Sequence, residues 1–478
     1  MKRASATVAT LFVLVLATGA CGLTPRGAEP LVPLEPLVPT PPGALPSAPP
    51  TPAPIEALVL PEVAVRELPH DMTLTVAKSD RPTTELCVVF RKGGDTMRLR
   101  HRWSLEIMAS VLARSQGLGG ATGRVASGQM RVCRGGHPSE APSVARALAR
   151  MVTAPRWDGH PADAARARAE SSLTDRVRST TFRGVVLAEQ QLLGTATPDR
   201  LSERLADVSF DALHGELAQS GQVAFVAVGA VDVERLAAAL TEILEPWQPV
   251  DEPAPAVSEP EGVATYDGAD VVVWRGGYAR ANLSVATAAP SAHGVDVDAF
   301  FILWHALDGS LTGRLYQALR IGESSAYSVG SIGWLGPERG TFVVSTSVDS
   351  EHVVGAVRAL VETLDRVRAG LTPEELRVGK LHRREGLRLG LETTGGVART
   401  LTNVVALDRD LQSLQERDRA IAALSSTDLR RVAAAYIGRR SPVIVLADDD
   451  TVEELLGADN LNVFDAGSLP GHRSREDD

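Results

Sequence analysis

The chain has 478 residues and a formal net charge of −10, from 49 basic and 59 acidic residues. Its length suggests about two to four domains. Apolar residues make up 44% and charged residues 23%, which excludes a wholly disordered or fibrous chain. The acidic balance argues against a protein that binds nucleic acid electrostatically. Only four of the basic residues are Lys, and we attribute the excess of Arg to composition bias, because the arginines are scattered and predict no basic stripe.

Residues 1–20 predict a signal peptide. Two basic residues precede the apolar stretch Thr7–Ala20, which is too short to span a bilayer of about 30 Å. The small residues before Cys21 resemble the lipobox of bacterial lipoproteins, in which this Cys is acylated, although Thr18 stands where Leu is usual. Because Gly22 is not the Asp that signals inner-membrane retention, we expect a lipid anchor in the outer membrane, facing the periplasm. An ordinary secretory signal with a chance Cys is the alternative.

Pro-rich segments divide the remaining chain. Residues 22–54 contain 12 Pro, which predicts an extended, semi-rigid spacer rather than a core. A second Pro-rich and acidic stretch separates two halves of similar length. The resulting organisation is a lipidated Cys with its tether over 21–59, an N-terminal domain over 60–248, a linker over 249–262, a C-terminal domain over 263–456 and a polar tail over 457–478.

The two halves resemble each other. The segment that begins at Ser127 parallels the one that begins at Arg339, each reading as a strand, a polar turn and an amphipathic helix. The segment from Val223 parallels the one from Pro442, each a short buried strand followed by the start of a helix. The order and spacing of these elements are both kept, which indicates an internal repeat. Strands and helices mix without regular alternation, so we expect α+β halves.

The second half shows its elements more clearly. Residues 342–348 alternate apolar and polar side chains, as a strand does. Ser350 predicts the start of a helix that Gly370 ends. The segment Thr372–Glu375 is a capping box with Pro at the first helical position, so a second helix begins there.

The segment from Asp298 to Ser331 carries a family resemblance. The run Gly313–Arg320, followed by Ala326–Gly330, resembles the C-terminal domain of pitrilysin/insulinase-type zinc metallopeptidases. That family has a small-residue turn, R-L-[FY]-x-x-L-R and then G-L-A-Y-S-V. The resemblance covers about Leu60 to Leu456. It implies two homologous α+β domains, each a mainly antiparallel sheet packed with helices, arranged as a clamshell around a peptide chamber.

The zinc motif of that family is absent. The motif H-x-x-E-H supplies two His ligands one helical turn apart and a Glu that activates water. None of the ten His residues are four positions apart, so neither this motif nor H-E-x-x-H occurs. Aligned with the family, Glu106, Ala109 and Ser110 take the motif positions. We therefore assign no metal ligand and no cofactor, expect zinc only in a partner subunit, and interpret Glu170, near the third ligand helix of the family, as a solvated residue.

One functional pair of the family is retained. Its members use an Arg and a Tyr, seven residues apart, to hold the substrate backbone and stabilise the oxyanion, and Arg320 and Tyr327 match that spacing. Both side chains donate hydrogen bonds to developing negative charge. Ser324 replaces the Gly that the family has between them. The alternative is structural, with the Arg ending a helix and the Tyr opening a strand.

Two further features have simpler interpretations. Cys87 and Cys133 are the cysteines left after the signal region, and an oxidising compartment permits a disulfide between them, although two buried free thiols would fit as well. The glycine-rich segment Gly117–Gly123 lacks the Lys of a phosphate-binding loop and predicts a turn between a helix and a strand.

These features predict a non-catalytic subunit of a periplasmic zinc metallopeptidase complex. Such a subunit binds peptide or unfolded polypeptide and supplies Arg320 and Tyr327 to a homologous partner that bears the zinc motif. The alternative is a peptide-binding or scaffold lipoprotein with no catalytic partner. A peptidase active alone would need an unrecognised metal site. We expect contact with the membrane through the lipid anchor and none with nucleic acid.

Overall fold

The computed structural model describes residues 57–91, 99–115, 117–126, 129–193, 209–249, 266, 268–322, 326–336 and 339–468. The side chains of residues 99–103 and 327 lie outside this description. So do the signal peptide, Cys21, nearly all of the Pro-rich tether and all of the linker 249–262 except its first residue. The chain from Ile55 onward forms one compact unit. Within the described ranges, no helix is both long enough and apolar enough to cross a membrane.

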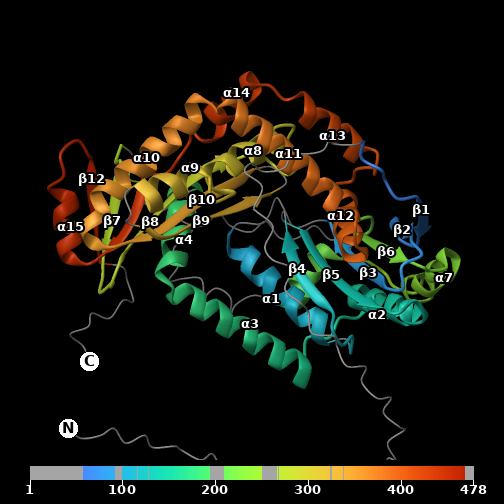
Figure 1. Ribbon diagram of the computed structural model, residues 1–478. Coiled ribbons are helices and arrows are strands. Elements are labelled where there is room, and N and C mark those ends of the chain that lie inside the picture. Colours follow the sequence, from blue (N-terminus) through green and yellow to red (C-terminus); the bar gives the residue numbers. More distant parts are fainter. Residues whose placement is uncertain are drawn as a thin grey trace, which may run out of the picture. The chain divides into compact units, whose positions relative to one another are not determined.

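Two six-stranded sheets, one from each half of the chain, organise this unit (Figure 1). The first sheet has the order β1-β2-β6-β3-β5-β4 and the second the order β12-β7-β11-β8-β10-β9. The strands of the first sheet are β1 (Val63–Leu68), β2 (Met72–Lys78), β3 (Thr84–Phe90), β4 (Thr122–Ala126), β5 (Gln129–Gly136) and β6 (Val223–Gly229). Those of the second are β7 (Val271–Arg275), β8 (Ala281–Ala289), β9 (Ala326–Leu335), β10 (Gly340–Val348), β11 (Val443–Ala447) and β12 (Val463–Ser468).

Five strands of each sheet repeat one topology. β2 pairs parallel to β6, as β7 does to β11. The next three pairs in each sheet are antiparallel, with β3 and β8, β5 and β10, and β4 and β9 in equivalent places. The α+β class and the pair of homologous domains predicted from the sequence are therefore confirmed.

The sixth strand of each sheet breaks the repeat. β1 lies antiparallel to β2, whereas β12 lies parallel to β7. β12 falls inside residues 457–478, for which we expected a polar tail, because its backbone completes the edge of the second sheet. At the other end, Leu58 from the expected tether is buried, and its carbonyl oxygen accepts a hydrogen bond of 3.1 Å from Gln415 Nε2.

The helices differ in which sheet they cover. The first half contains α1 (Leu99–Ser115), α2 (Ala141–Thr153), α3 (His160–Arg178), α4 (Thr180–Leu193), α6 (Phe210–Leu217) and α7 (Val233–Leu244). The second contains α8 (Val297–Asp308), α9 (Arg314–Tyr316), α10 (Val353–Ala369), α11 (Pro373–Leu389), α12 (Thr394–Ala406), α13 (Ser413–Ala423), α14 (Ser426–Tyr436) and α15 (Asp449–Leu456). The capping box at Thr372 begins α11, and Gly370, with φ of +136°, ends α10, as predicted.

One helix from each half packs on the sheet of the other half. One face of the first sheet packs on α1, α2, α6 and α7, and the other face packs on α12. One face of the second sheet packs on α8, α10, α14 and α15, and the other face packs on α4. Apolar side chains on both faces of the central strands make this possible, as in β6, where every residue is buried. The two halves thus share their cores.

The contact between α4 and the second sheet leaves no room for a side chain at Gly184. A Cβ there would overlap the side chains of Asn282 and Ser284 on β8. Both belong to a buried polar cluster, in which Ser284 Oγ donates to Ser345 Oγ at 2.9 Å and Asn282 Nδ2 donates to the same oxygen at 3.3 Å. The helix approaches the sheet closely because residue 184 is glycine.

We predict that Gly184→Ala destabilises the protein although it replaces a helical Gly by a better helix former. Displacing α4 from β8 should cost about 1–3 kcal/mol, seen as a lower midpoint of urea unfolding. The control is Gly386→Ala in α11, where a Cβ meets nothing within 4 Å and the gain should be about 0.5–1 kcal/mol. Equal midpoints for the two variants would refute the close contact.

Candidate functional site

The helix expected to carry the zinc motif is α1. Its apolar side chains recur at helical spacing, with Leu105, Met108 and Leu112 buried in the first core. Glu106, Ser110 and Arg114 occupy another stripe of the same helix, four residues apart, and face α3. The sequence therefore places one carboxylate, one hydroxyl and one guanidinium along the side of α1 that is outside the core.

Ala109 takes the position of the catalytic Glu in the family motif, and packing leaves no open space there. Ala109 is fully buried, and a Cβ on Gly123 would overlap its carbonyl oxygen. Gly123 lies in β4, not in the turn that we predicted for the whole segment 117–123. The turn itself uses Gly117 and Gly120, whose φ angles are +73° and +79°. Glycine at position 123 thus lets the edge strand lie directly against α1.

The motif position of the first His ligand is occupied by a paired carboxylate. Glu106 Oε2 lies 3.4 Å from Arg176 Nη1 on α3. The helix α3 also carries Glu170, whose side chain is exposed, as predicted. A zinc site needs at least three nitrogen, sulfur or oxygen ligands at about 2.0–2.3 Å. Among the described side chains, these positions offer a single carboxylate held by a guanidinium, so they do not fit zinc.

A cleft of about 410 Å³ lies between α1, β4 and α3. Figure 1 shows these three elements side by side. Three arginines from α1 and α3 and one carboxylate give it a positive balance. The charged and hydroxyl-bearing residues of the two helices that line it are Glu106, Ser110, Arg114, Arg168, Ser172 and Arg176, and residues 123–125 of β4 form its third side.

This cleft is a local exception to our expectation that the arginines are scattered and form no basic stripe. Arg168 and Arg176 lie eight residues apart on α3, with Ser172 between them, which is the spacing of one helix face. That spacing could have predicted from the sequence that the two arginines share one helix face. The approach of Arg114 to the same cleft could not be predicted, because it depends on how α1 and α3 pack.

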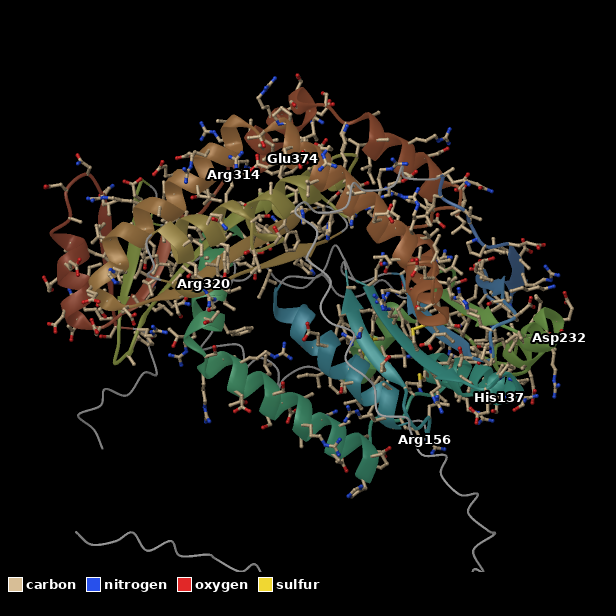
Figure 2. All side chains as sticks on the ribbon, in the orientation of Figure 1. His137, Arg156, Asp232, Arg314, Arg320 and Glu374 are labelled. Carbon is tan, nitrogen blue, oxygen red and sulfur yellow. A yellow bond between two sulfur atoms is a disulfide. The ribbon has the colours of Figure 1, made fainter. Side chains whose placement is uncertain are left out.

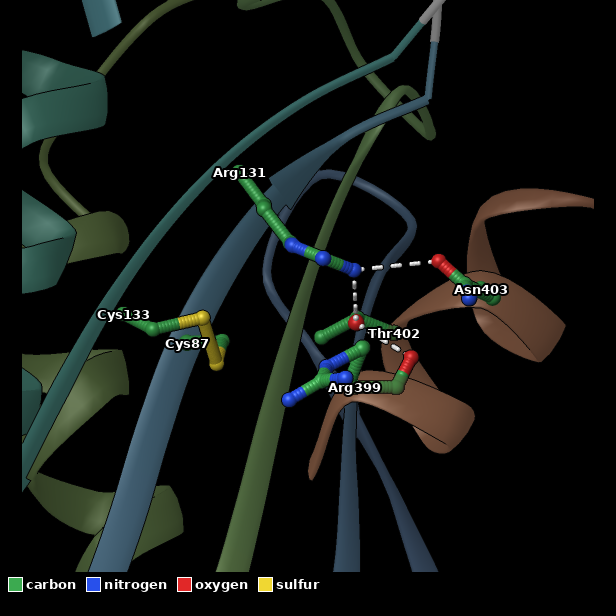
Figure 3. Close-up of a disulfide and its surroundings, with 6 residues drawn as sticks. All are labelled: Cys87, Arg131, Cys133, Arg399, Thr402 and Asn403. Carbon is green, nitrogen blue, oxygen red and sulfur yellow. Dashed lines mark hydrogen bonds between the residues drawn. A yellow bond between two sulfur atoms is a disulfide. The ribbon is translucent and has the colours of Figure 1, made fainter. Parts of the chain in front are cut away.

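More positive charge lies on the face of the same sheet edge that α12 covers. Arg124 on β4 and Arg131 on β5 are register partners, so both side chains start on this face, opposite to Gly123 and Val125. Arg131 Nη1 donates 3.0 Å hydrogen bonds to Thr402 Oγ1 and Asn403 Oδ1 on α12, next to Arg399 (Figure 3). Burial, and then the like charges of Arg399 and Arg124, lower the pKa of Arg131.

Cys87 and Cys133 are joined by a disulfide in the structure (Figure 3). They are register partners on β3 and β5, with Cα atoms 4.1 Å apart. Glu85 lies close to both sulfurs, and burial raises the pKa of its carboxyl group. Because the sulfurs are bonded to each other, this group of three offers no thiolate for a metal.

Arg320 lies on a single π-helical turn, Gln317–Gly322, that leads to the edge strand β9. Leu319 in this turn is fully buried, whereas Arg320 is exposed, with its guanidinium carbon 5.4 Å from the ring centroid of Tyr316 (Figure 2). Tyr327 is the second residue of β9, and its side chain lies outside the described residues, as does Ser324. The structure thus brings Arg320 to the start of the strand that carries Tyr327.

An ion pair fixes the base of this turn. Arg314 donates to both carboxylate oxygens of Glu375 at 2.7 Å, and its Nη2 donates to the carbonyl oxygen of Gly370 at 3.0 Å. Glu375 also accepts a hydrogen bond of 2.7 Å from the backbone N–H of Thr372, which completes the capping box of α11. One guanidinium therefore joins the helix before Arg320 to the end of α10 and the start of α11.

Comparisons with known proteins agree with this architecture. Residues 209–381, which include Arg320 and Tyr327, match the family model of the peptidase M16 inactive domain. No curated protein sequence matches the chain. The resemblance to a zinc-peptidase family, without its zinc motif, is thereby confirmed.

Solved structures share the fold at low sequence identity. A protease from Helicobacter pylori is 15% identical, with a TM-score of 0.66 over 81% of this chain and 100% of that chain. A peptidase M16 inactive domain from Pseudomonas fluorescens is 14% identical, with a TM-score of 0.64 over 86% and 99%. The periplasmic protease PqqL from Escherichia coli is 16% identical, with a TM-score of 0.60 over 82% of this chain and 46% of that longer chain.

We predict that Glu375→Gln destabilises the protein near neutral pH. The hydrogen bonds from Arg314 are the main cause that lowers the pKa of Glu375 from 4.5 to about 2. A lowered folded-state pKa stabilises the fold above pH 4.5, and this contribution disappears as the pH falls toward 2. After solvent screening we expect a loss of about 1 kcal/mol at pH 7.

Urea unfolding of the wild type and the variant between pH 3 and pH 7 measures this contribution. The difference between their midpoints should shrink as the pH falls. The neighbouring Glu374→Gln is the control, because Glu374 bonds only the exposed Arg377 among the described side chains. A difference for Glu375→Gln that does not change with pH would contradict the role of the ion pair.

Proposed function

We propose that the chain, of which residues 209–381 match the peptidase M16 inactive domain, is the non-catalytic subunit of a periplasmic zinc metallopeptidase complex. In this proposal a homologous partner supplies the zinc motif, and this chain supplies Arg320 and Tyr327 to the partner's active site. The substrate is a peptide or an unfolded polypeptide. The observation that carries the proposal is the contrast between Glu106, which Arg176 holds where a zinc ligand would be, and the exposed Arg320 beside an edge strand.

The surroundings of Arg320 support a role in recognition. β9 is the last strand of its sheet and, among the described strands, pairs only with β10, so its outer edge can accept an extended peptide. A guanidinium at the start of that edge donates hydrogen bonds to a carbonyl oxygen, and these strengthen when the oxygen gains negative charge. The anchor at Arg314 holds the turn in place without contacting the substrate.

The proposed location is the bacterial cell envelope. The signal sequence and Cys21 support a lipid anchor, and the Pro-rich segment supports a spacer that holds the folded unit away from the membrane. The fold that the chain shares with a periplasmic protease of Escherichia coli is consistent with the periplasmic side of the outer membrane.

A second candidate function is peptide binding without any catalytic partner. The arginine-lined cleft favours it, since the positive charge of that cleft can hold a ligand without any catalytic group. The two candidates differ in what they require of Arg320, which matters for cleavage only in the first.

Capture of the tagged, full-length lipoprotein from its own cells, with the bound proteins identified by mass, separates the candidates. The first candidate predicts a homologue with H-x-x-E-H in equal amount. Recovery of the chain alone, under conditions in which other envelope complexes stay intact, would refute the complex and leave the second candidate.

We predict that Arg320→Ala in the complex lowers kcat/KM for peptide cleavage by about 10²–10³-fold, because a donor to the oxyanion is lost. Assembly with the partner, measured by gel filtration, should be unchanged. Arg419→Ala, at an exposed Arg on α13, is the control. Full cleavage activity in Arg320→Ala would exclude its contribution to catalysis.

A further inference from the structure

We propose that the cleft between α1, β4 and α3 binds the carboxylates of a peptide, with arginines where the metallopeptidases of this family hold their metal. The proposal rests on the proposed function only in its premise that the chain binds peptide. It adds the chemical class of that peptide, which is acidic, and the site at which the acidity is recognised.

The balance of charges in the cleft is the first argument. Glu106 is its single carboxylate, and Arg176 already holds it. Arg114 and Arg168 each lie two helical turns, about 12 Å along their helices, from that pair. Neither has a carboxylate partner among the residues that the structure describes. Two unneutralised guanidiniums therefore line one cleft of a chain whose net charge is −10.

The second argument is a separate repulsion between arginines on the α12 face of the same sheet edge. Arg131 hydrogen-bonds the neutral side chains Thr402 and Asn403, and the like charges of Arg399 and Arg124 act on it. Burial removes part of the solvent that would screen these charges from one another. Because Arg124 is on the edge strand β4 itself, a carboxylate bound along that strand would relieve this repulsion as well, which gives it an advantage over a neutral group of the same shape.

The third argument concerns why the ligand is a peptide rather than a free anion. β4 is the terminal strand of the first sheet and, within the described ranges, pairs only with β5. Its outer N–H and C=O groups are therefore available to an added strand. In an extended peptide, alternate side chains project on the same side about 6.8 Å apart. Acidic residues at alternate positions would thus meet the arginines of α1 and α3 in succession.

The contact between Gly123 and Ala109 places this edge directly beside the cleft. Because no side chain separates the strand from α1 at that point, a peptide paired with β4 lies next to Arg114 and Arg168. The volume of about 410 Å³ accommodates a few side chains, not a folded domain.

Binding of fluorescein-labelled ten-residue peptides to the full-length chain, followed by fluorescence anisotropy, tests this proposal. One peptide has Glu at alternate positions and Val or Thr between them, and its match has Gln in place of Glu. We expect the Glu peptide to bind about tenfold more tightly at low salt, with the difference shrinking as the ionic strength rises. The same pair with amidated C-termini distinguishes recognition of side-chain carboxylates from recognition of the terminal carboxylate.

The variant that tests the site is the double substitution Arg114→Gln with Arg168→Gln. Both side chains are exposed, so the fold should be retained. The control has the same change of charge outside the cleft, Arg150→Gln with Arg178→Gln, at exposed positions on α2 and α3. We expect the cleft variant to lose the preference for Glu and the control to keep it.

Two results would overturn the proposal. One is equal binding of the Glu and Gln peptides, with either terminus, by the wild-type chain. The other is an equal loss of preference in the cleft variant and in the control, which would mean that net charge alone attracts the peptide. Because the assay uses this chain without a partner, its result is independent of the test of Arg320.

Discussion

Each sheet of this protein has one face that is covered by a helix from the other half of the chain. α12 packs on β3 and β6, and α4 packs on β8, β10 and β11. These contacts bury apolar side chains from both halves, such as Val397 with Val226 and Leu187 with Val343. Neither sheet could bury both of its faces alone, so the two halves depend on each other for their cores. The relative position of every surface feature follows from this exchange.

The exchange also explains how a peptidase-like fold persists without its metal. In a zinc enzyme the metal ties the motif helix to the helix that carries the third ligand. Here Arg176 on α3 holds Glu106 on α1, and the apolar contact at Ala109 closes the position between them. An exposed ion pair of this kind stabilises by at most about 1 kcal/mol. The shared cores, not the substitute for the metal, therefore maintain the arrangement, and the site was free to change its chemistry.

The sequence predicted what depends on local pattern. The repeated strand–turn–helix segments, the strand at 342–348 and the capping box at Thr372 all follow from spacing and residue type. The loss of zinc ligands was equally visible, because a missing histidine pair needs no structure to be seen.

Features that arise from contacts between distant segments could not be predicted. The exchange of α4 and α12 has no local signature, since an amphipathic helix does not indicate which sheet it covers. Arg114 and Arg168 line one cleft only because α1 and α3 pack against each other. The polar composition of residues 457–468 gave no indication of β12, because this strand pairs through its backbone rather than through apolar side chains.

The most direct test of this account is a calorimetric titration of the full-length chain with Zn²⁺ at pH 7, repeated on Glu106→Ala. The account predicts no stoichiometric zinc site in either protein, because Glu106 stands without a second ligand at the motif positions and is held by Arg176. Tight binding of one zinc ion per chain that is lost in Glu106→Ala would contradict it, and would show that α1 retains the metal centre of the family.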